Sequence, residues 1–182
     1  PRENGEDYFR FGLSLQESFE GDNGFQLSAS YTDLALNRYG GEWQTFLNVG
    51  ETLGIFTEFY QPVDLEQRYY VFANTSATRF NRNINDALDS RVTLEQRRIF
   101  DATTQIGAGI NFDNWGTFRV ALGRTFGNVR DRSSFPRTLL STYDRTAINA
   151  EFIVDTLDNI RFPTSGTALN IRYKNNATFI GG

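Results

Sequence analysis

The feature that most constrains the fold is an alternation of apolar and polar residues that recurs along the chain, weaker in Leu53–Tyr60 and less clear in Tyr69–Ala77. In Phe9–Gln16, every odd position is apolar and every even position is polar or glycine. Side chains of a β-strand point alternately to the two faces of a sheet, so this period predicts strands with one apolar face. The predicted strands are Phe9–Gln16, Phe25–Thr32, Trp43–Val49, Leu53–Tyr60, Tyr69–Ala77, Arg91–Asp113, Thr117–Phe126, Thr146–Asp155 and Thr167–Lys174. No segment of useful length has helical periodicity, which predicts an all-β, antiparallel fold.

The segment Arg91–Asp113 could be one long strand or two strands joined at 101–104. Val92, Leu94, Phe100, Ile106, Ala108, Ile110 and Phe112 all fall on even positions, whereas a turn would normally reset this phase. No Gly, Pro or Asn marks a turn in Phe100–Gln105. The pattern predicts one long strand, with a bulge at Asp101 as an option. At about 3.3 Å per residue, such a strand would exceed the ~30 Å core of a bilayer and project beyond it.

Composition leaves both membrane and soluble β-proteins open. The chain has 17 Phe and 8 Tyr, yet its longest purely apolar stretch is Tyr69–Ala73, far short of the ~20 residues of a transmembrane helix. In transmembrane barrels only every second residue of a strand faces lipid, so apolar residues alternate with polar ones. Soluble β-sandwiches and barrels show the same alternation. Glu151, Asp155, Arg172 and Lys174 place both signs of charge on the polar face of the last two strands, as in a watery barrel lumen. Nine successive strands with mostly hairpin links favour the membrane barrel.

The links between strands suggest an orientation. Counted from the first strand, the even-to-odd links are compact, while the odd-to-even links include the long polar segments Asn81–Ser90 and Gly127–Asp144. Outer-membrane barrels have short periplasmic turns and longer outer loops. The pattern therefore predicts a periplasmic N-terminus, with the first strand running outward.

Catalytic chemistry is narrowly bounded by composition. The absence of His and Cys excludes His-based triads, thiolate nucleophiles, the usual zinc sites and disulfides. No Gly-x-Ser-x-Gly motif is present, and Gly107-Ala108-Gly109 lacks the third glycine and the helix of a phosphate-binding loop. The net charge of −4 argues against a nucleic-acid partner. We expect no catalytic residue, metal or cofactor; Asp155 and Asp158 are better explained by turn capping and lumen polarity than by a carboxylate pair.

Two groups of surface residues carry binding hypotheses. Arg130, Arg132 and Arg137 fall with Asp131 in the longest predicted loop, and Arg97-Arg98 falls where the long strand would project outward. These arginines could contact lipopolysaccharide phosphates or a partner, or they could simply be solvated. A second group, at strand–turn junctions, contains Tyr39, Trp43 and Trp115. An interfacial aromatic belt would explain this group in a membrane, and core packing would explain it in a soluble protein.

The most specific motif lies near the C-terminal end of the chain. It has the form D-x-x-D-N-x-x-F-P-x-x-G and comprises Asp155, Asp158, Asn159, Phe162, Pro163 and Gly166. This motif resembles the strand–turn–strand signature of the bacterial surface antigen superfamily. Pro163 would fix φ, Gly166 would permit a turn conformation, and Asp158 or Asn159 could accept hydrogen bonds from nearby backbone amides. The resemblance implies a sixteen-stranded outer-membrane barrel, usually preceded by periplasmic POTRA domains.

Three earlier stretches of the sequence indicate one branch of this superfamily. They are Tyr8–Leu13, Leu36–Trp43 and Phe56–Asp64. Their succession resembles the barrel of patatin-like outer-membrane proteins, also called type Vd autotransporters. In that family a patatin phospholipase domain and one POTRA domain precede the barrel. The resemblance implies that residues 1–7 end the POTRA linker and that residues 8–182 form the N-terminal part of the barrel, about nine of sixteen strands. The family's inward-folded loop motif and terminal aromatic residue are missing, so we expect a truncated segment of a longer protein.

The resemblance also implies a function. The segment would anchor an N-terminal patatin-like lipase domain that lies outside this chain, and in an extended role it would also translocate that domain. The segment itself would not be an enzyme. Its partners would be outer-membrane lipid, the barrel assembly machinery during insertion and the passenger domain in cis. Three alternatives stay open: a superfamily barrel for outer-membrane protein assembly or polypeptide secretion, a complete small barrel with its own ligand or enzyme activity, and a soluble β-sheet interaction module.

Overall fold

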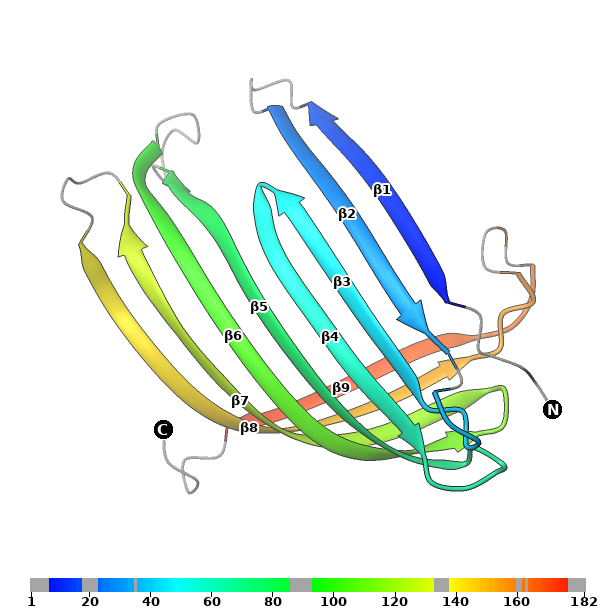
Figure 1. The fold of residues 1–182 in the computed structure, drawn as a ribbon. Coiled ribbons are helices and arrows are strands. Elements are labelled where there is room, and N and C mark those ends of the chain that lie inside the picture. Colours follow the sequence, from blue (N-terminus) through cyan, green and yellow to red (C-terminus); the bar gives the residue numbers. More distant parts are fainter. Residues whose placement is uncertain are drawn as a thin grey trace.

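A computed structural model of the chain describes residues 7–17, 23–34, 36–85, 93–132, 138–159, 162 and 164–176. It contains one antiparallel sheet of nine strands, in which each strand pairs with its neighbours in sequence (Figure 1). The strands are β1 (Tyr8–Glu17), β2 (Asn23–Asp33), β3 (Glu42–Gly50), β4 (Thr52–Pro62), β5 (Tyr69–Asn85), β6 (Thr93–Phe112), β7 (Gly116–Asp131), β8 (Leu139–Asp155) and β9 (Ala168–Asn176). The predicted all-β class, strand number and antiparallel arrangement are confirmed. Of the predicted linker at residues 1–7, only Asp7 is among the described residues.

The long strand is confirmed, but its predicted bulge is not. β6 runs without interruption from Thr93 to Phe112, and Asp101 is in regular register with Thr78 of β5 and Gly127 of β7. The register shifts lie elsewhere, at Ile84/Asn85 and at Val129/Arg130. Each lies near the end of a long hairpin, where a bulge disturbs few ladder hydrogen bonds.

The predicted difference in loop length is wrong. β5 and β7 continue to Asn85 and Asp131, so much of the two polar links expected as loops is strand. The remaining connections at 86–92 and 132–138 are no longer than the β8–β9 connection at 156–167. Polar residues extend these hairpins because the antiparallel ladder satisfies their backbone N–H and C=O groups whatever the side chains.

The sheet is coiled and open. β8 and β9 curve round behind the strands that precede them (Figure 1). β1 pairs with β2 and β9 pairs with β8, and within the described residues neither strand has a second partner. We call the lower end the end that holds the connections at 34–41, 63–68, 113–115 and 156–167; the upper end is the opposite one.

Side chains pack across the curve of the sheet on its concave face. Contacts there reach across an intervening strand: Tyr70 of β5 and Thr117 of β7 share a hydrogen bond of 3.0 Å, and Asn111 Nδ2 of β6 donates to Tyr60 Oη of β4 at 3.0 Å. The buried cluster of Tyr70, Phe72 and Ala121 lies on this face. In the part of the chain that the structure describes, no helix is long and apolar enough to cross a membrane.

Candidate functional site

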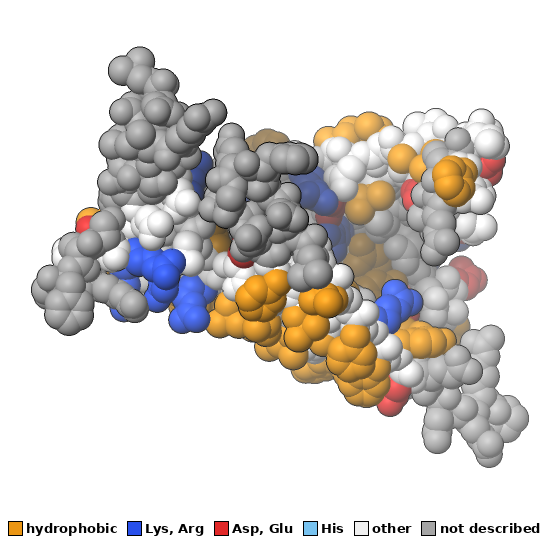
Figure 2. Space-filling view, turned by 90° about the horizontal axis from the view of Figure 1, so that it is seen from above, with side chains coloured by type: hydrophobic (Ala, Val, Ile, Leu, Met, Phe, Trp, Pro, Cys, Tyr) orange, Lys and Arg blue, Asp and Glu red, His pale blue; other side chains and the backbone are white. Residues whose placement is uncertain are grey.

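The convex face of the sheet carries most of the exposed large apolar side chains among the described residues. By register, this outer face carries the odd-numbered side chains of β1–β5 and β9 and the even-numbered side chains of β6–β8. Apolar side chains gather on it in Figure 2. Its exposed members include Phe9, Phe11, Leu13, Leu27, Leu47, Leu53, Ile55, Val71, Ile106, Val120, Leu122 and Ile171. In β1–β7 the described concave face exposes only Tyr8 and Phe46 among large apolar residues. Contiguous apolar surface on this scale marks contact with a membrane or another protein.

The apolar band crosses the strands obliquely. Leu53 of β4 is directly opposite Arg79 of β5. At this height of the sheet β4 is therefore still apolar, whereas the apolar band on β5 has already ended. On β7 and β8 the apolar pairs lie nearer the lower end, as Leu122 opposite Ile148 shows. Strands of membrane barrels tilt by about 35–45° from the membrane normal. A flat lipid layer would therefore contact each successive strand at residues further along the strand, which gives an oblique apolar band.

Aromatic residues lie at the lower border of this band. Trp43 is the second residue of β3, and its ring lies 6.1 Å from that of Phe59. Trp115 lies in the β6–β7 turn and stacks on Phe112 at 5.0 Å, and both tryptophans are partly exposed. Tyr39, in the β2–β3 connection, accepts a hydrogen bond of 2.8 Å from Arg38. Exposed rings at strand ends suit an interfacial belt, because indole and phenol groups combine an apolar body with a polar edge.

The concave face carries a charged network centred on Glu151 of β8. Arg119 Nε of β7 donates to one carboxylate oxygen at 2.7 Å, and Arg172 Nε of β9 donates to the other at 2.6 Å. Asn170 Nδ2 also donates to Glu151, at 3.3 Å. The carboxylate is buried among these partners, whereas the Arg172 side chain is 75% exposed. Glu151, Arg119 and Arg172 line a hollow of about 570 Å³ on the concave face, with Glu58, Asn74 and Lys174 among its other polar residues.

Glycines on the concave face make room for aromatic rings from neighbouring strands. A Cβ atom at Gly107 would lie 2.7 Å from the Phe72 ring, and one at Gly109 would overlap the Tyr70 ring. At Gly127 the added atom would lie 2.5 Å from Tyr143 Oη, whose hydroxyl donates to Asp101 across β7. Glycines covered by aromatic rings let a sheet coil tightly, because the inner face of a curved sheet has less area per residue. Sequence inspection missed this pairing, since ring and glycine lie on different strands.

The signature residues form the β8–β9 connection. Asp158 accepts hydrogen bonds from the backbone N–H of Thr164 at 2.9 Å and of Ser165 at 3.1 Å. Asn159 Oδ1 accepts from Phe162 N at 3.1 Å, and Asp155 Oδ1 accepts from Leu157 N at 3.1 Å. Gly166 has a φ of 107°, which favours glycine. Phe162 is exposed, and Pro163 lies outside the described residues. The described members thus act on the backbone of the turn.

Hydrogen bonds from Thr164 and Ser165 lower the pKa of the Asp158 carboxyl to about 2. A carboxyl whose pKa is lower in the folded than in the unfolded protein stabilises the fold when the pH is above its unfolded-state pKa. This stabilisation is lost as the pH falls through the folded-state pKa. We therefore expect Asp158→Asn to lower the urea midpoint of unfolding at pH 7. The difference from wild type should shrink as the pH falls from about 4 to about 2. Glu66→Gln, an exposed carboxylate of the β4–β5 connection, is the control. Equal pH dependence in both variants would contradict the assignment.

The predicted basic loop residues are not all in a loop. Arg130 and Asp131 are the last residues of β7, Arg132 follows directly, and Arg137 lies outside the described residues. The register places Arg130 directly opposite Arg98 of β6. Both arginines are among the predicted binding residues, but their proximity to Arg79 is not predictable, because the sequence does not reveal which strand positions lie side by side.

Among the described residues, no group of three or more His, Cys, Asp and Glu side chains could hold a metal ion. Asp155 and Asp158 each serve the backbone amides of the turn, so they do not form a shared carboxylate site. Comparison with protein-family models, with curated proteins and with solved structures found no match. The resemblance to the bacterial surface antigen superfamily therefore stays a prediction.

Proposed function

We propose that the sheet is part of the wall of a bacterial outer-membrane β-barrel, with lipid on its convex face and a watery lumen on its concave face. The observation that carries this proposal is the oblique apolar band on the convex face, opposite a concave face that holds the buried Glu151 network. A soluble sheet buries its apolar face against another layer, whereas among the described residues nothing covers the apolar convex face, and the concave face carries the charged network. A lipid-facing wall around a polar lumen has this arrangement.

In this proposal the two edge strands, β1 and β9, require further strands to close the barrel. An unpaired edge inside a bilayer leaves backbone N–H and C=O groups without partners, which costs several kcal/mol for each group. β1 and β9 would therefore need additional strands, and the resemblance of the 155–166 motif suggests a barrel of about sixteen. In the same proposal, the long hairpins β5–β6 and β7–β8 end on the outer side of the membrane, and the N-terminus lies in the periplasm.

In this proposal the segment is an anchor rather than an enzyme. The stretches Tyr8–Leu13, Leu36–Trp43 and Phe56–Asp64 support an anchor for an N-terminal patatin-like lipase domain. A barrel for protein assembly or secretion would use the same wall. A Gly-x-Ser-x-Gly motif upstream of this segment in the parent protein would favour the lipase anchor, and its absence would favour the other role.

The test compares the chain in plain buffer with the chain refolded into detergent micelles. We expect the far-UV circular dichroism of a β-sheet only in micelles, and aggregation in buffer, because the outer face has no partner in water. Sedimentation in both conditions gives the state of association. A cooperative, monomeric fold in plain buffer would overturn the proposal and favour a soluble β-sheet interaction module.

A further inference from the structure

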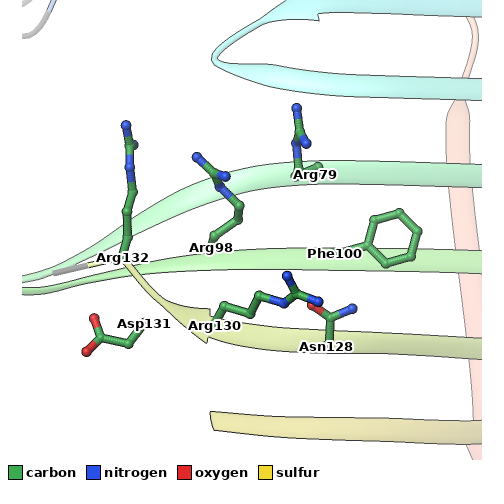
Figure 3. A pocket seen from close by; sticks show the side chains of 7 residues that line it. All are labelled: Arg79, Arg98, Phe100, Asn128, Arg130, Asp131 and Arg132. Atoms are coloured by element: carbon green, nitrogen blue, oxygen red, sulfur yellow. The ribbon is translucent and has the colours of Figure 1, made fainter. Parts of the chain in front are cut away.

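Three arginines from three adjacent strands meet on the outer face near its upper end. They are Arg79 of β5, Arg98 of β6 and Arg130 of β7, and Figure 3 shows them around one cleft. Arg98 and Arg130 are directly opposite in register, while Arg79 is opposite Phe100, two residues along β6 from Arg98. The cleft has a volume of about 220 Å³.

This arrangement places Arg98 and Arg130 directly opposite each other, with Arg79 close by. Like charges directly opposite each other on two strands destabilise a sheet. In the described part of the chain, no carboxylate forms an ion pair with Arg79 or Arg130. Asp131 also lines the cleft, but in Figure 3 its carboxylate is turned away from Arg98 and Arg130, and its register partner is Arg97 on the concave face. An anion in the cleft would remove the repulsion.

One arginine of the same outer face is neutralised by an ion pair. Arg124 of β7 forms a bidentate ion pair with Asp144 of β8, with N–O distances of 2.9 and 2.6 Å. Arg124 lies on the same face and the same strand as Arg130, closer to the apolar band. In the part of the chain that the structure describes, Arg79 and Arg130 have no such ion pair.

An apolar groove adjoins the cleft. It has a volume of about 380 Å³ and runs along the outer face between β3, β4 and β5, lined by Leu47, Val49, Leu53, Ile55 and Ala77. Arg79 and Phe100 line both the groove and the cleft. A single ligand that fills both hollows must have a negatively charged head and an apolar chain.

We propose that the cleft of Arg79, Arg98 and Arg130 binds the phosphate of an anionic lipid headgroup, with an acyl chain of that lipid in the adjoining groove. The inference rests on the proposed contact between the outer face and lipid. Guanidinium groups suit this ligand, because their planar N–H forks form bidentate, charge-assisted hydrogen bonds with phosphate oxygens. The site lies above the apolar band, at the level where headgroups would meet a tilted barrel wall.

The test measures lipid binding by native mass spectrometry of the refolded chain in dodecylmaltoside micelles. Dioleoyl phosphatidic acid is the probe, and dioleoyl phosphatidylcholine, with the same chains, is the matched lipid. We expect the wild type to bind phosphatidic acid in preference. The double variant Arg98→Gln/Arg130→Gln should weaken that binding at least about tenfold and leave phosphatidylcholine binding unchanged. Arg79→Gln, further from the bulge at Val129/Arg130, supplies a second variant if the double variant does not refold.

Arg82→Gln/Arg97→Gln is the control, because it removes two opposed arginines from the concave face of the same hairpin. We expect it to keep phosphatidic acid affinity within about twofold of wild type, since those side chains do not face the proposed lipid. Equal loss in both double variants would overturn the site, as would equal binding of the two lipids by wild type. Displacement of phosphatidic acid by millimolar inorganic phosphate would show an anion site without lipid specificity. A chain that folds in plain buffer would instead overturn the barrel wall and this site with it.

Discussion

Leu47→Arg should destabilise the micelle-refolded chain by about 2–4 kcal/mol, the cost of an arginine on the lipid face near the middle of a bilayer. Leu47 lies on β3, on the outer face, and is paired with Ala29 of β2 and Ile55 of β4 within the apolar band. Its side chain is 45% exposed, so the substitution creates no cavity and little steric conflict. The loss would come from moving a charge into hydrocarbon. Urea unfolding in micelles, followed by circular dichroism, measures it.

Asn48→Arg is the matched control. It is the next residue of β3, at nearly the same depth, but it is paired with Ser28 and Gly54 on the concave face. We expect a change within about 0.5 kcal/mol, because a surface substitution facing water disturbs little. Equal, small effects of the two substitutions would mean that the outer face does not meet lipid. Equal, large effects would point to steric disruption of β3 instead.

The second large effect is expected at Gly109, where substitution by Ala should cost about 3 kcal/mol, the upper range for overpacking. An added Cβ would overlap the Tyr70 ring and lie 2.8 Å from the carbonyl oxygen of Phe118. The ring has little freedom to move, since Tyr70 is 6% exposed, packs 4.7 Å from Tyr60 and shares a hydrogen bond with Thr117. Unfolding in urea again measures the loss.

Gly54→Ala provides the comparison for Gly109. Gly54 is also a buried strand glycine, but its added Cβ would meet only Thr78 Cγ2 at 3.3 Å and the Ala77 carbonyl oxygen at 3.7 Å. We expect a cost below about 1 kcal/mol, because an alanine in a strand restricts the unfolded chain more than glycine does. If both substitutions cost the same, close packing of Tyr70 on Gly109 does not hold the curvature of the sheet.

The candidate site was only partly predictable. Asp158 and Asn159 could be assigned to the turn because their hydrogen bonds reach Thr164, Ser165 and Phe162, only a few residues away. The Glu151 network could not be predicted as such, since Arg119 lies 32 residues before Glu151 and Arg172 lies 21 residues after it. Alternation placed these side chains on a polar face, but only strand register brings them to one level.

What the sequence by itself determined is local: nine strands, the face on which each side chain lies, and the unbroken course of β6. These properties depend on a period of two residues and on phase, which a single strand already contains. Tertiary structure alone decided how far the β5–β6 and β7–β8 hairpins extend, which arginines share a level, and where rings cover Gly107, Gly109 and Gly127. These features depend on register and curvature, and each of them is a relation between strands whose energy comes from pairing and packing across the whole sheet.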